Sequence, residues 1–174
     1  MADVKLPPHG ASKHGINPLF LRDQELRQAM ELLFFAYRDF TAEPDAILAQ
    51  HGFGRAHHRA LHFIGRHPGI TVSELLGILR ITKQSLNRVL GQLIEKGYVE
   101  QRQGTRDRRQ RLLALTAAGH TLEERVSADQ RARIAKAYRE AGAEAVEGFR
   151  KVLLGIIAGA PDRARFERPG PPRR

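Results

Sequence analysis

Residues 82–111 read TKQSLNRVLGQLIEKGYVEQRQGTRDRRQR, and this stretch decides the fold. Its first half spaces apolar residues at intervals of three, four, seven and eight, which predicts the buried face of an amphipathic helix over residues 82–96. That face comprises Leu86, Val89, Leu90, Leu93 and Ile94. The opposite stripe carries Gln84, Asn87 and Arg88, whose side chains can pair with base edges or phosphates.

A basic hairpin is expected after this helix. Gly97 is a residue type that commonly ends helices, and residues 98–103 and 109–115 predict two strands joined at 104–108. The stretch 82–111 holds eight Lys or Arg residues and three Asp or Glu residues. Its net charge of 8 − 3 = +5 is half of the formal net charge of +10 of the whole chain. A helix with one apolar face, joined to a cationic hairpin, is suited to binding duplex DNA.

Composition sets the class of protein. A chain of 174 residues with 41% hydrophobic residues can form one globular domain, with or without helical extensions. Its pI of about 10.8 favours a polyanionic partner. The longest run of apolar or glycine residues, 152–160, is far shorter than the roughly 20 residues of a membrane span, and the N-terminus has no secretion segment. We therefore expect a cytoplasmic protein without membrane partners.

The chain has no cysteine, which excludes disulfides, thiolate metal sites and thiol redox sensing. It also lacks a nucleophile elbow, a phosphate-cradling glycine-rich loop and a cysteine nucleophile. We therefore expect no catalytic residues, and no cofactor, in this protein.

Helix signals precede residues 82–96. A helix is predicted over about 54–66, ending at His67-Pro68-Gly69, and the next begins with the capping box Thr71-Val72-Ser73-Glu74. Thr82 is a good N-cap for the helix that follows. Two helices joined by a turn of about three residues form a helix-turn-helix.

Longer helices flank this motif. One is predicted over about 20–41, another from Thr116 to about 141, and an amphipathic one over about 143–158. The fold class is therefore mainly α with a small β-hairpin wing (α+β): a winged helix-turn-helix framed by terminal helices. The expected segments are a flexible arm (1–18), an N-terminal dimerisation helix (19–45), the DNA-binding domain (46–115), C-terminal dimerisation helices (116–160) and a disordered basic tail (161–174).

The first long helix is apolar on more than one face, which is too wide a surface for a small winged unit to cover. A partner subunit would cover it. The residues expected at such an interface lie on both terminal helices: Leu26, Met30, Leu33, Tyr37, Val146, Phe149, Leu153 and Ile156.

Residues 70–119, ITVSELLGILRITKQSLNRVLGQLIEKGYVEQRQGTRDRRQRLLALTAAG, resemble the MarR-type winged-helix transcription regulators. The resemblance extends over about residues 25–158. The wing of that family usually reads Asp-x-Arg-Asp-x-Arg; here Arg106, Asp107 and Arg109 match, and Gly104 stands in place of the first Asp. The resemblance implies a homodimer built by the terminal helices on a pseudo-palindromic DNA operator. Many members repress, and many release DNA on binding a small anionic or phenolic ligand, a metal or an oxidant.

The helix 82–96 is expected to enter the major groove by its N-terminal half. Arg88 could pair with guanine, and Gln84 or Asn87 with adenine, whereas Lys83 and Ser85 are expected on phosphates; which of them reach bases stays open. Arg106 would enter the minor groove, with Asp107 orienting Arg106 or Arg109 through a salt bridge. The full set of expected DNA-binding residues is Thr82, Lys83, Gln84, Ser85, Asn87, Arg88, Arg102, Arg106, Arg108 and Arg109.

Histidines gather around the second helix. His58 and His62 lie four residues apart and could share a metal ion, but a structural or surface role is the stronger interpretation. Alternatively, the histidines line an effector pocket between this helix and the dimerisation helices, where their titration would change DNA affinity.

The leading hypothesis is a sequence-specific homodimeric regulator, with a repressor favoured. Three alternatives remain: an architectural protein that binds DNA with low specificity, an RNA-binding winged helix, and a ligand sensor for which DNA contact is secondary.

Overall fold

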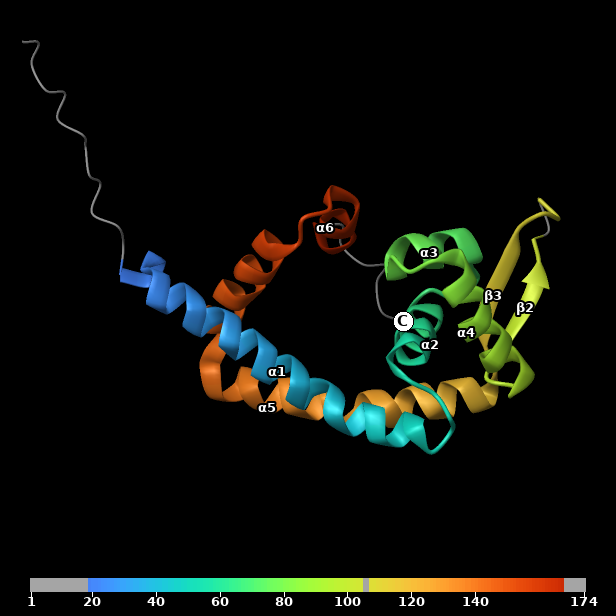
Figure 1. Ribbon diagram of the computed structural model, residues 1–174, viewed down its shortest axis with the longest axis horizontal. Helices are drawn as coiled ribbons and strands as arrows, with labels where there is room; N and C mark the ends of the chain where they lie inside the picture. The colour runs from blue at the N-terminus through green and yellow to red at the C-terminus, as the bar shows by residue number, and fades with distance from the viewer. Residues whose placement is uncertain (1–18, 105–106, 168–174) are drawn as a thin grey trace, which may run out of the picture. The chain divides into compact units, whose positions relative to one another are not determined.

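The computed structural model describes residues 19–104 and 107–167 (Figure 1). The chain divides into two compact units, residues 1–39 and residues 40–174, called here the first and second unit. The described part of the first unit holds a short 3-10 helix, Leu19–Leu21, and the beginning of α1, Asp23–Ala49, which continues into the second unit. None of the described helices is long and apolar enough to cross a membrane.

The second unit contains the predicted helix-turn-helix and wing. Its elements after α1 are α2 (Arg55–Arg66), β1 (Ile70–Thr71), α3 (Val72–Leu79), α4 (Lys83–Glu95), β2 (Val99–Gln103), β3 (Arg111–Leu115), α5 (Ala117–Ile156) and α6 (Ala160–Glu167). The strands form one antiparallel sheet in the order β1-β3-β2. The mainly helical fold with a small β wing is thus confirmed, and β1 is an addition that the sequence pattern did not predict.

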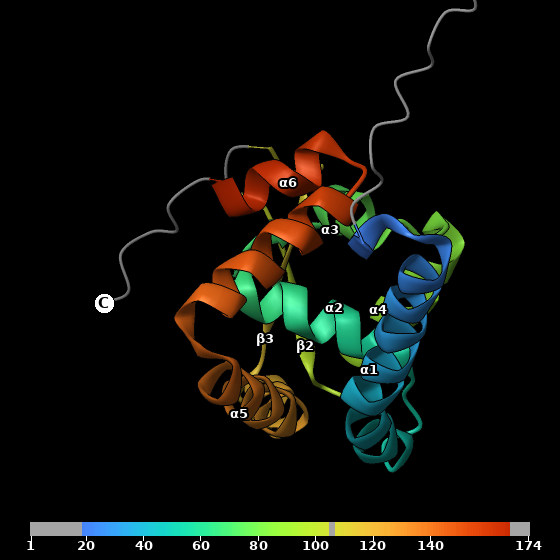
Figure 2. The same cartoon turned by 90° about the vertical axis from the view of Figure 1, so that its left-hand side faces the viewer.

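Helix α2 lies at the centre of the second unit (Figure 2) and packs against α3, α4, α5 and β3. Four of the five residues predicted on the apolar face of α4 are buried, namely Leu86, Val89, Leu90 and Leu93. The fifth prediction is wrong, because Ile94 is 37% exposed. Eight residues advance a helix by about 80° beyond two full turns, so Ile94 lies at the edge of the face that Leu86 defines.

The helix boundaries follow from local capping. Thr71 and Glu74 form the predicted capping box: the Glu74 carboxylate accepts the Thr71 N–H at 2.8 Å, and the Thr71 hydroxyl accepts the Glu74 N–H at 3.1 Å. The Thr82 hydroxyl accepts the Ser85 N–H at 3.1 Å. Gly97 ends α4 with φ of +75°, a left-handed conformation in which glycine carries no steric penalty.

Helix α1 runs eight residues beyond its predicted end at residue 41, passing through Pro44. A proline inside a helix leaves the carbonyl four residues earlier without its backbone donor. That carbonyl belongs to Phe40, and the Gln130 side chain of α5 donates to it at 3.0 Å. Gln130 is 9% exposed, and Leu48 in the last turn of α1 is fully buried. The end of α1 therefore belongs to the second unit, which begins at residue 40.

The C-terminal part of the chain contains one predicted feature and one unpredicted one. Gly142, with φ of +79° and ψ of 165°, interrupts α5 between the two helices expected on either side of it.

Residues 160–167 form α6, although a disordered tail was predicted from 161. The guanidinium of Arg80, at the end of α3, pairs with Asp162 of α6 at 2.9 Å. This long-range contact has no local sequence signal, so the prediction was wrong for these residues; residues 1–18 and 168–174 lie outside the described chain.

Candidate DNA-binding surface

Helix α4 separates an apolar face from a polar one. Lys83, Gln84, Asn87 and Arg88 are exposed, and the side chains on the opposite face form part of the hydrophobic core. The N-terminus of α4 also presents a partial positive charge to a ligand, because its first amides have no intrahelical acceptor.

Two of the predicted DNA-binding residues also hold the start of α4. The Thr82 hydroxyl donates to the Ser85 Oγ at 2.9 Å while it accepts the Ser85 N–H. Ser85 is half-buried, whereas Thr82 is exposed. Their positions at the beginning of the helix agree with phosphate contacts, and their hydrogen bonds give them a structural role as well.

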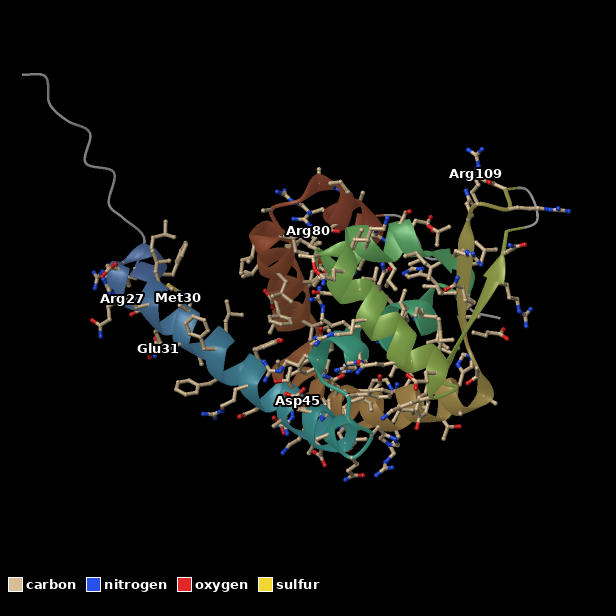
Figure 3. All side chains as sticks on the ribbon, turned by 45° about the vertical axis from the view of Figure 1, so that its right-hand side comes forward. Arg27, Met30, Glu31, Asp45, Arg80 and Arg109 are labelled. Carbon is tan, nitrogen blue, oxygen red and sulfur yellow. The ribbon has the colours of Figure 1, made fainter. Side chains whose placement is uncertain are left out.

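Strands β2 and β3 form a wing with basic side chains. Arg102 is exposed and pairs with Glu100 on the same strand at 2.8 Å. Arg109 projects from the end of the wing, away from the body of the second unit (Figure 3). Arg108 is exposed beside it, while Arg106 lies outside the described residues.

Asp107 contacts the backbone of the wing, and its predicted salt bridge to Arg106 stays a prediction because Arg106 lies outside the described residues. A salt bridge to the side chain of Arg106 or Arg109 was expected. The structure has the carboxylate accepting the backbone N–H of Arg109 at 2.9 Å, so Asp107 shapes the turn through the backbone.

The wing turn also explains Gly104, the position at which the family pattern has aspartate. Gly104 donates its N–H to the Gln110 carbonyl at 3.0 Å, and Gln110 donates to the Asp107 carbonyl at 3.0 Å. A Cβ at position 104 would lie 2.6 Å from the Asp107 oxygen, which is closer than real contacts allow. The turn between β2 and β3 therefore has room only for glycine at position 104.

The structure adds residues around the helix-turn-helix that sequence patterns did not identify. The Arg59 side chain of α2 donates to the Leu79 carbonyl at 2.9 Å and so satisfies the C-terminal end of α3. Arg80 adopts a left-handed conformation with φ of +49° and forms its ion pair with Asp162. A non-glycine residue in this conformation carries no reliable local signal, which is why the sequence did not reveal it.

The histidines of α2 have separate environments. His62 Nδ1 lies 3.4 Å from the Glu123 carboxylate, which also accepts the Ser127 hydroxyl at 2.7 Å. Burial, and then the nearby His62, lower the pKa of His58, which keeps this imidazole neutral at pH 7. Within residues 19–104 and 107–167, no three His, Cys, Asp or Glu side chains are grouped so that they could hold a metal ion.

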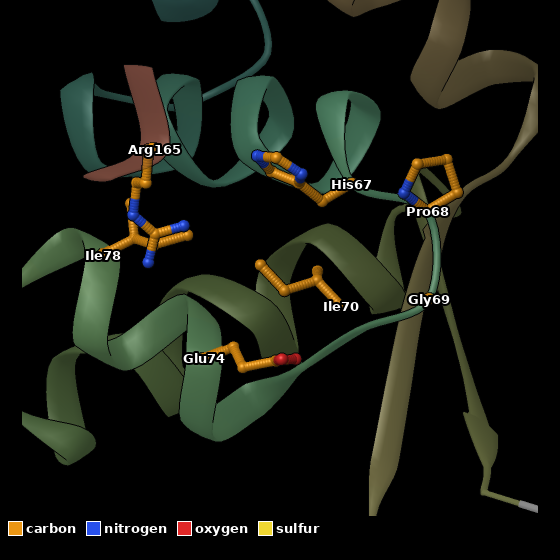
Figure 4. A pocket seen from close by; sticks show the side chains of 7 residues that line it. All are labelled: His67, Pro68, Gly69, Ile70, Glu74, Ile78 and Arg165. Carbon is orange, nitrogen blue, oxygen red and sulfur yellow. The ribbon is translucent and has the colours of Figure 1, made fainter. Parts of the chain in front are cut away.

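A pocket of about 300 Å³ lies beside the end of α2, and Figure 4 shows His67, Glu74 and Arg165 around it, with Ile70 and Ile78. Hydrogen bonds from Thr71 lower the pKa of Glu74, so its carboxylate is charged. Burial, then Arg165, lower the pKa of His67. His67 is the histidine that lines this pocket, and the predicted histidine-lined effector site between α2 and the dimerisation helices stays a prediction.

The residues predicted at a dimer interface are accessible. Met30 is 56% exposed in the first unit, and Phe149 and Ile156 of the second unit are 47% and 58% exposed. Leu26, Leu33, Tyr37 and Leu153 are exposed too, and Val146 is half-buried.

Comparison with known proteins gives one consistent result. The MarR family model matches residues 51–110. The HTH-type transcriptional regulator PetP of Rhodobacter capsulatus is 59% identical over 157 residues, covering 90% of this chain and 91% of PetP.

Solved structures share the fold. Streptococcus pneumoniae FabT in complex with DNA has a TM-score of 0.64 and 20% identity, and the match covers 75% of this chain and 94% of that one. A mutant MarR from E. coli complexed with operator DNA has a TM-score of 0.58 and 23% identity, covering 80% and 98%. The fold and the relatives define a winged helix-turn-helix transcriptional regulator rather than an enzyme. The chain belongs to the MarR family, which confirms the resemblance seen in the sequence.

Proposed function

We propose that this regulator binds duplex DNA sequence-specifically, as a homodimer on a pseudo-palindromic operator, and represses transcription from it. The observation that carries the proposal is the exposed stripe Gln84, Asn87 and Arg88 on α4, beside a wing rich in arginine. The DNA complexes of FabT and E. coli MarR, which share this fold, support the same role.

Helix α4 enters the major groove with its N-terminal half. Arg88 is suited to guanine, Gln84 or Asn87 to adenine, and Lys83 to a phosphate near the helix N-terminus. The wing follows the DNA backbone with Arg102, Arg108 and Arg109 and inserts Arg106 into the minor groove, where a narrow A·T-rich segment attracts cations.

The second copy of the chain pairs through the terminal helices. Soluble monomers rarely expose contiguous apolar patches of large area, and Phe149, Val152 and Ile156 are all exposed on the last part of α5. A two-fold dimer places two recognition helices on half-sites about one helical turn apart.

The pocket of Figure 4 is our candidate effector site, because it is lined by α3 of the helix-turn-helix and by Arg165 of α6. Benzoate, a small organic anion, is a suitable probe: titration should raise the Tm of the wild type, and Arg165→Gln should remove that rise. Arg163→Gln, on the same helix, is the matched control, because Arg163 does not line the pocket.

Selection of sheared genomic DNA by the purified protein at roughly 0.15 M salt, followed by sequencing, tests the proposal. Enrichment of a few promoter fragments that share an inverted repeat is the expected result. Even recovery across the genome would favour the architectural alternative, and preference for RNA would exclude the major-groove arrangement. A reporter fused to the enriched promoter should be more active without the regulator if it represses.

The role of Arg88 gives a sharper test of sequence specificity. Arg88→Ala should weaken binding to the selected operator by about 1–3 kcal/mol and leave random DNA nearly unchanged, because a base contact carries the discrimination. Arg133→Ala, which removes an exposed arginine from α5, is the control. Equal weakening on all DNA would identify Arg88 as a phosphate contact.

A further inference from the structure

A buried histidine joins the helix α2 to the recognition helix α4. His57 is 9% exposed, and its ring stacks on Phe53 with centroids 4.7 Å apart and an interplanar angle of 19°. Its Nδ1 lies 3.1 Å from the backbone nitrogen of Gly54, and its Nε2 lies 2.7 Å from the Oε1 of Gln92 on α4. Both ring nitrogens are therefore engaged, one with its own helix and one with the recognition helix.

These two bonds fix the protonation state of the ring. The Gly54 N–H can only donate, so Nδ1 must be an unprotonated acceptor. A neutral imidazole with a bare Nδ1 carries its proton on Nε2, which then donates to the Gln92 carbonyl oxygen. The neutral Nε2–H tautomer is the single form that satisfies both partners. A doubly protonated ring would set an N–H on Nδ1 against the Gly54 N–H.

The bond to Gly54 also caps α2. Gly54 is the N-cap of that helix and has no side chain to satisfy its amides, so His57, at the third helical position, reaches back to the N-cap N–H. Glutamate or glutamine usually does this in a capping box, as Glu74 does for α3. Protonation of His57 would leave Nε2–H able to donate to Gln92 but would break the bond between Nδ1 and the Gly54 N–H, and so loosen the start of α2 that holds the ring in place.

Gln92 follows Arg88 by about one helical turn on α4. A bond that holds Gln92 to α2 therefore fixes the rotation of α4 and the direction of the residues that face the groove. We propose that His57 is a positioning residue for DNA recognition, which the start of α2 holds against Gln92 of the recognition helix only in the neutral Nε2–H tautomer. The inference rests on the proposed DNA-binding function.

The ring contacts and hydrogen bonds described around His57 and Phe53 bring no carboxylate to this cluster. The charged and titratable groups that described ring contacts and hydrogen bonds bring to the cluster are His51, Lys96 and Tyr98. Lys96 Nζ lies 5.0 Å from the Phe53 centroid and donates to the His51 carbonyl, and the Tyr98 hydroxyl lies 2.9 Å from His51 Nδ1. On α2 itself, Arg55 lies two residues before His57, and His58 follows it directly.

A glutamine at position 57 can form both hydrogen bonds of the His57 ring but does not take up a proton. Its carbonyl oxygen can accept the Gly54 N–H and its NH₂ can donate to Gln92, at any pH. His57→Gln should bind the operator at pH 7.5 like the wild type. His57→Leu, which removes both bonds, should weaken operator binding about tenfold. His58→Gln is the matched control, because it changes the neighbouring histidine and neither of these bonds.

The decisive comparison is operator affinity at pH 7.5 and at pH 5.5. The wild type and His58→Gln should lose about tenfold more affinity than His57→Gln on acidification, since protonation breaks the bond between His57 Nδ1 and the Gly54 N–H and leaves the corresponding glutamine bond intact. Equal pH profiles for the wild type and His57→Gln would overturn the proposal.

A measurement without DNA gives the second test. The ¹⁵N chemical shifts of the His57 ring at pH 7.5 should report a bare Nδ1 and a protonated Nε2; the opposite tautomer would overturn the inference. A wild type that binds no DNA specifically would refute the proposed function, and with it the role of His57 in recognition. The ring shifts would still report the tautomer, so the two failures are distinguishable.

Discussion

The winged part of the second unit, residues 55–115, and the terminal helices use apolar side chains in opposite ways. In the winged part, Leu61, Leu75 and Leu86 are completely buried within the same chain. On the terminal helices, Phe20 is 71% exposed, Phe34 68% and Val152 61%. One region completes its own hydrophobic core, and the other presents apolar surface that a single chain leaves open to water.

The difference follows from the width of each apolar face. An amphipathic helix such as α4 has one stripe to bury, and α2 provides the surface for it. The beginning of α1 is apolar around much of its circumference, so no single contact can cover it. Burial of one large apolar side chain stabilises by about 1.5–3 kcal/mol, which gives these helices a strong drive to associate. A homodimer built on them would have a stability that depends on protein concentration.

The largest effect should come from placing a charge on the exposed apolar surface. Met30→Glu should convert the dimer to monomers at micromolar concentration and weaken operator binding by about 100-fold or more, because two linked half-site contacts become one. Analytical ultracentrifugation and operator titration measure the two effects. Gln28→Glu is the control on the same helix, outside the stripe of Leu26, Met30 and Leu33. A fully dimeric Met30→Glu protein would place the interface elsewhere.

The core of the winged part should respond differently. Leu93→Ala removes a completely buried side chain from α4 and should lower the free energy of unfolding by about 2–5 kcal/mol. Ile94→Ala, one residue further on the same helix, should cost about 1 kcal/mol or less, because Ile94 is already 37% exposed. Urea denaturation gives both values. Similar losses for the two variants would mean that Ile94 is covered in the assembled protein.

The same contrast separates what the sequence predicted from what it did not. Helix ends set by neighbouring residues were predicted well: the Thr71–Glu74 box, the Thr82 cap and the Gly97 termination all depend on contacts within a few positions. The apolar spacing of α4 identified four of five buried residues, because burial there follows helix geometry.

Features that depend on distant partners were missed. The extension of α1 through Pro44 requires Gln130, which is ninety positions later than Phe40. Helix α6 is held by the contact between Asp162 and Arg80, which lies 82 positions earlier. Sequence patterns show the type of each side chain and the spacing of apolar residues along a helix or strand. They do not show which carbonyl elsewhere in the chain lacks a hydrogen-bond donor. The residues predicted to contact bases remain predictions, although the exposed stripe of α4 agrees with them.

The contact between Gln130 and Phe40 allows this lesson to be tested quantitatively. Gln130→Leu should destabilise the protein by about 1–3 kcal/mol, because the Phe40 carbonyl loses its only described side-chain donor. In the Pro44→Ala background the backbone N–H of residue 44 can donate to that carbonyl, so Gln130→Leu should cost clearly less. A double-mutant cycle by urea denaturation measures this coupling. Additive effects would show that Gln130 does not substitute for the missing donor.

The smallest expected effect is the change of thermal stability with pH that comes from His58 in the winged part. The exposed helices should not show this effect. Burial, and then the nearby His62, lower the pKa of His58 in the folded state, so the unfolded chain binds a proton more readily. Stability from this group is therefore complete above the ordinary histidine pKa of about 6.5 and is lost as the pH falls through the lower folded-state value.

The Tm of the wild type should consequently fall between pH 7.5 and 5.5, and His58→Gln should lose less of its Tm over the same interval. His120→Gln, which replaces an exposed histidine at the start of α5, should follow the wild type. Burial is the largest cause of the lowered His58 pKa, so the effect depends on how closely the chain packs around α2. If His58→Gln and His120→Gln gave the same change, the acid sensitivity would come from elsewhere, and the winged part would be less tightly closed around α2 than its buried leucines indicate.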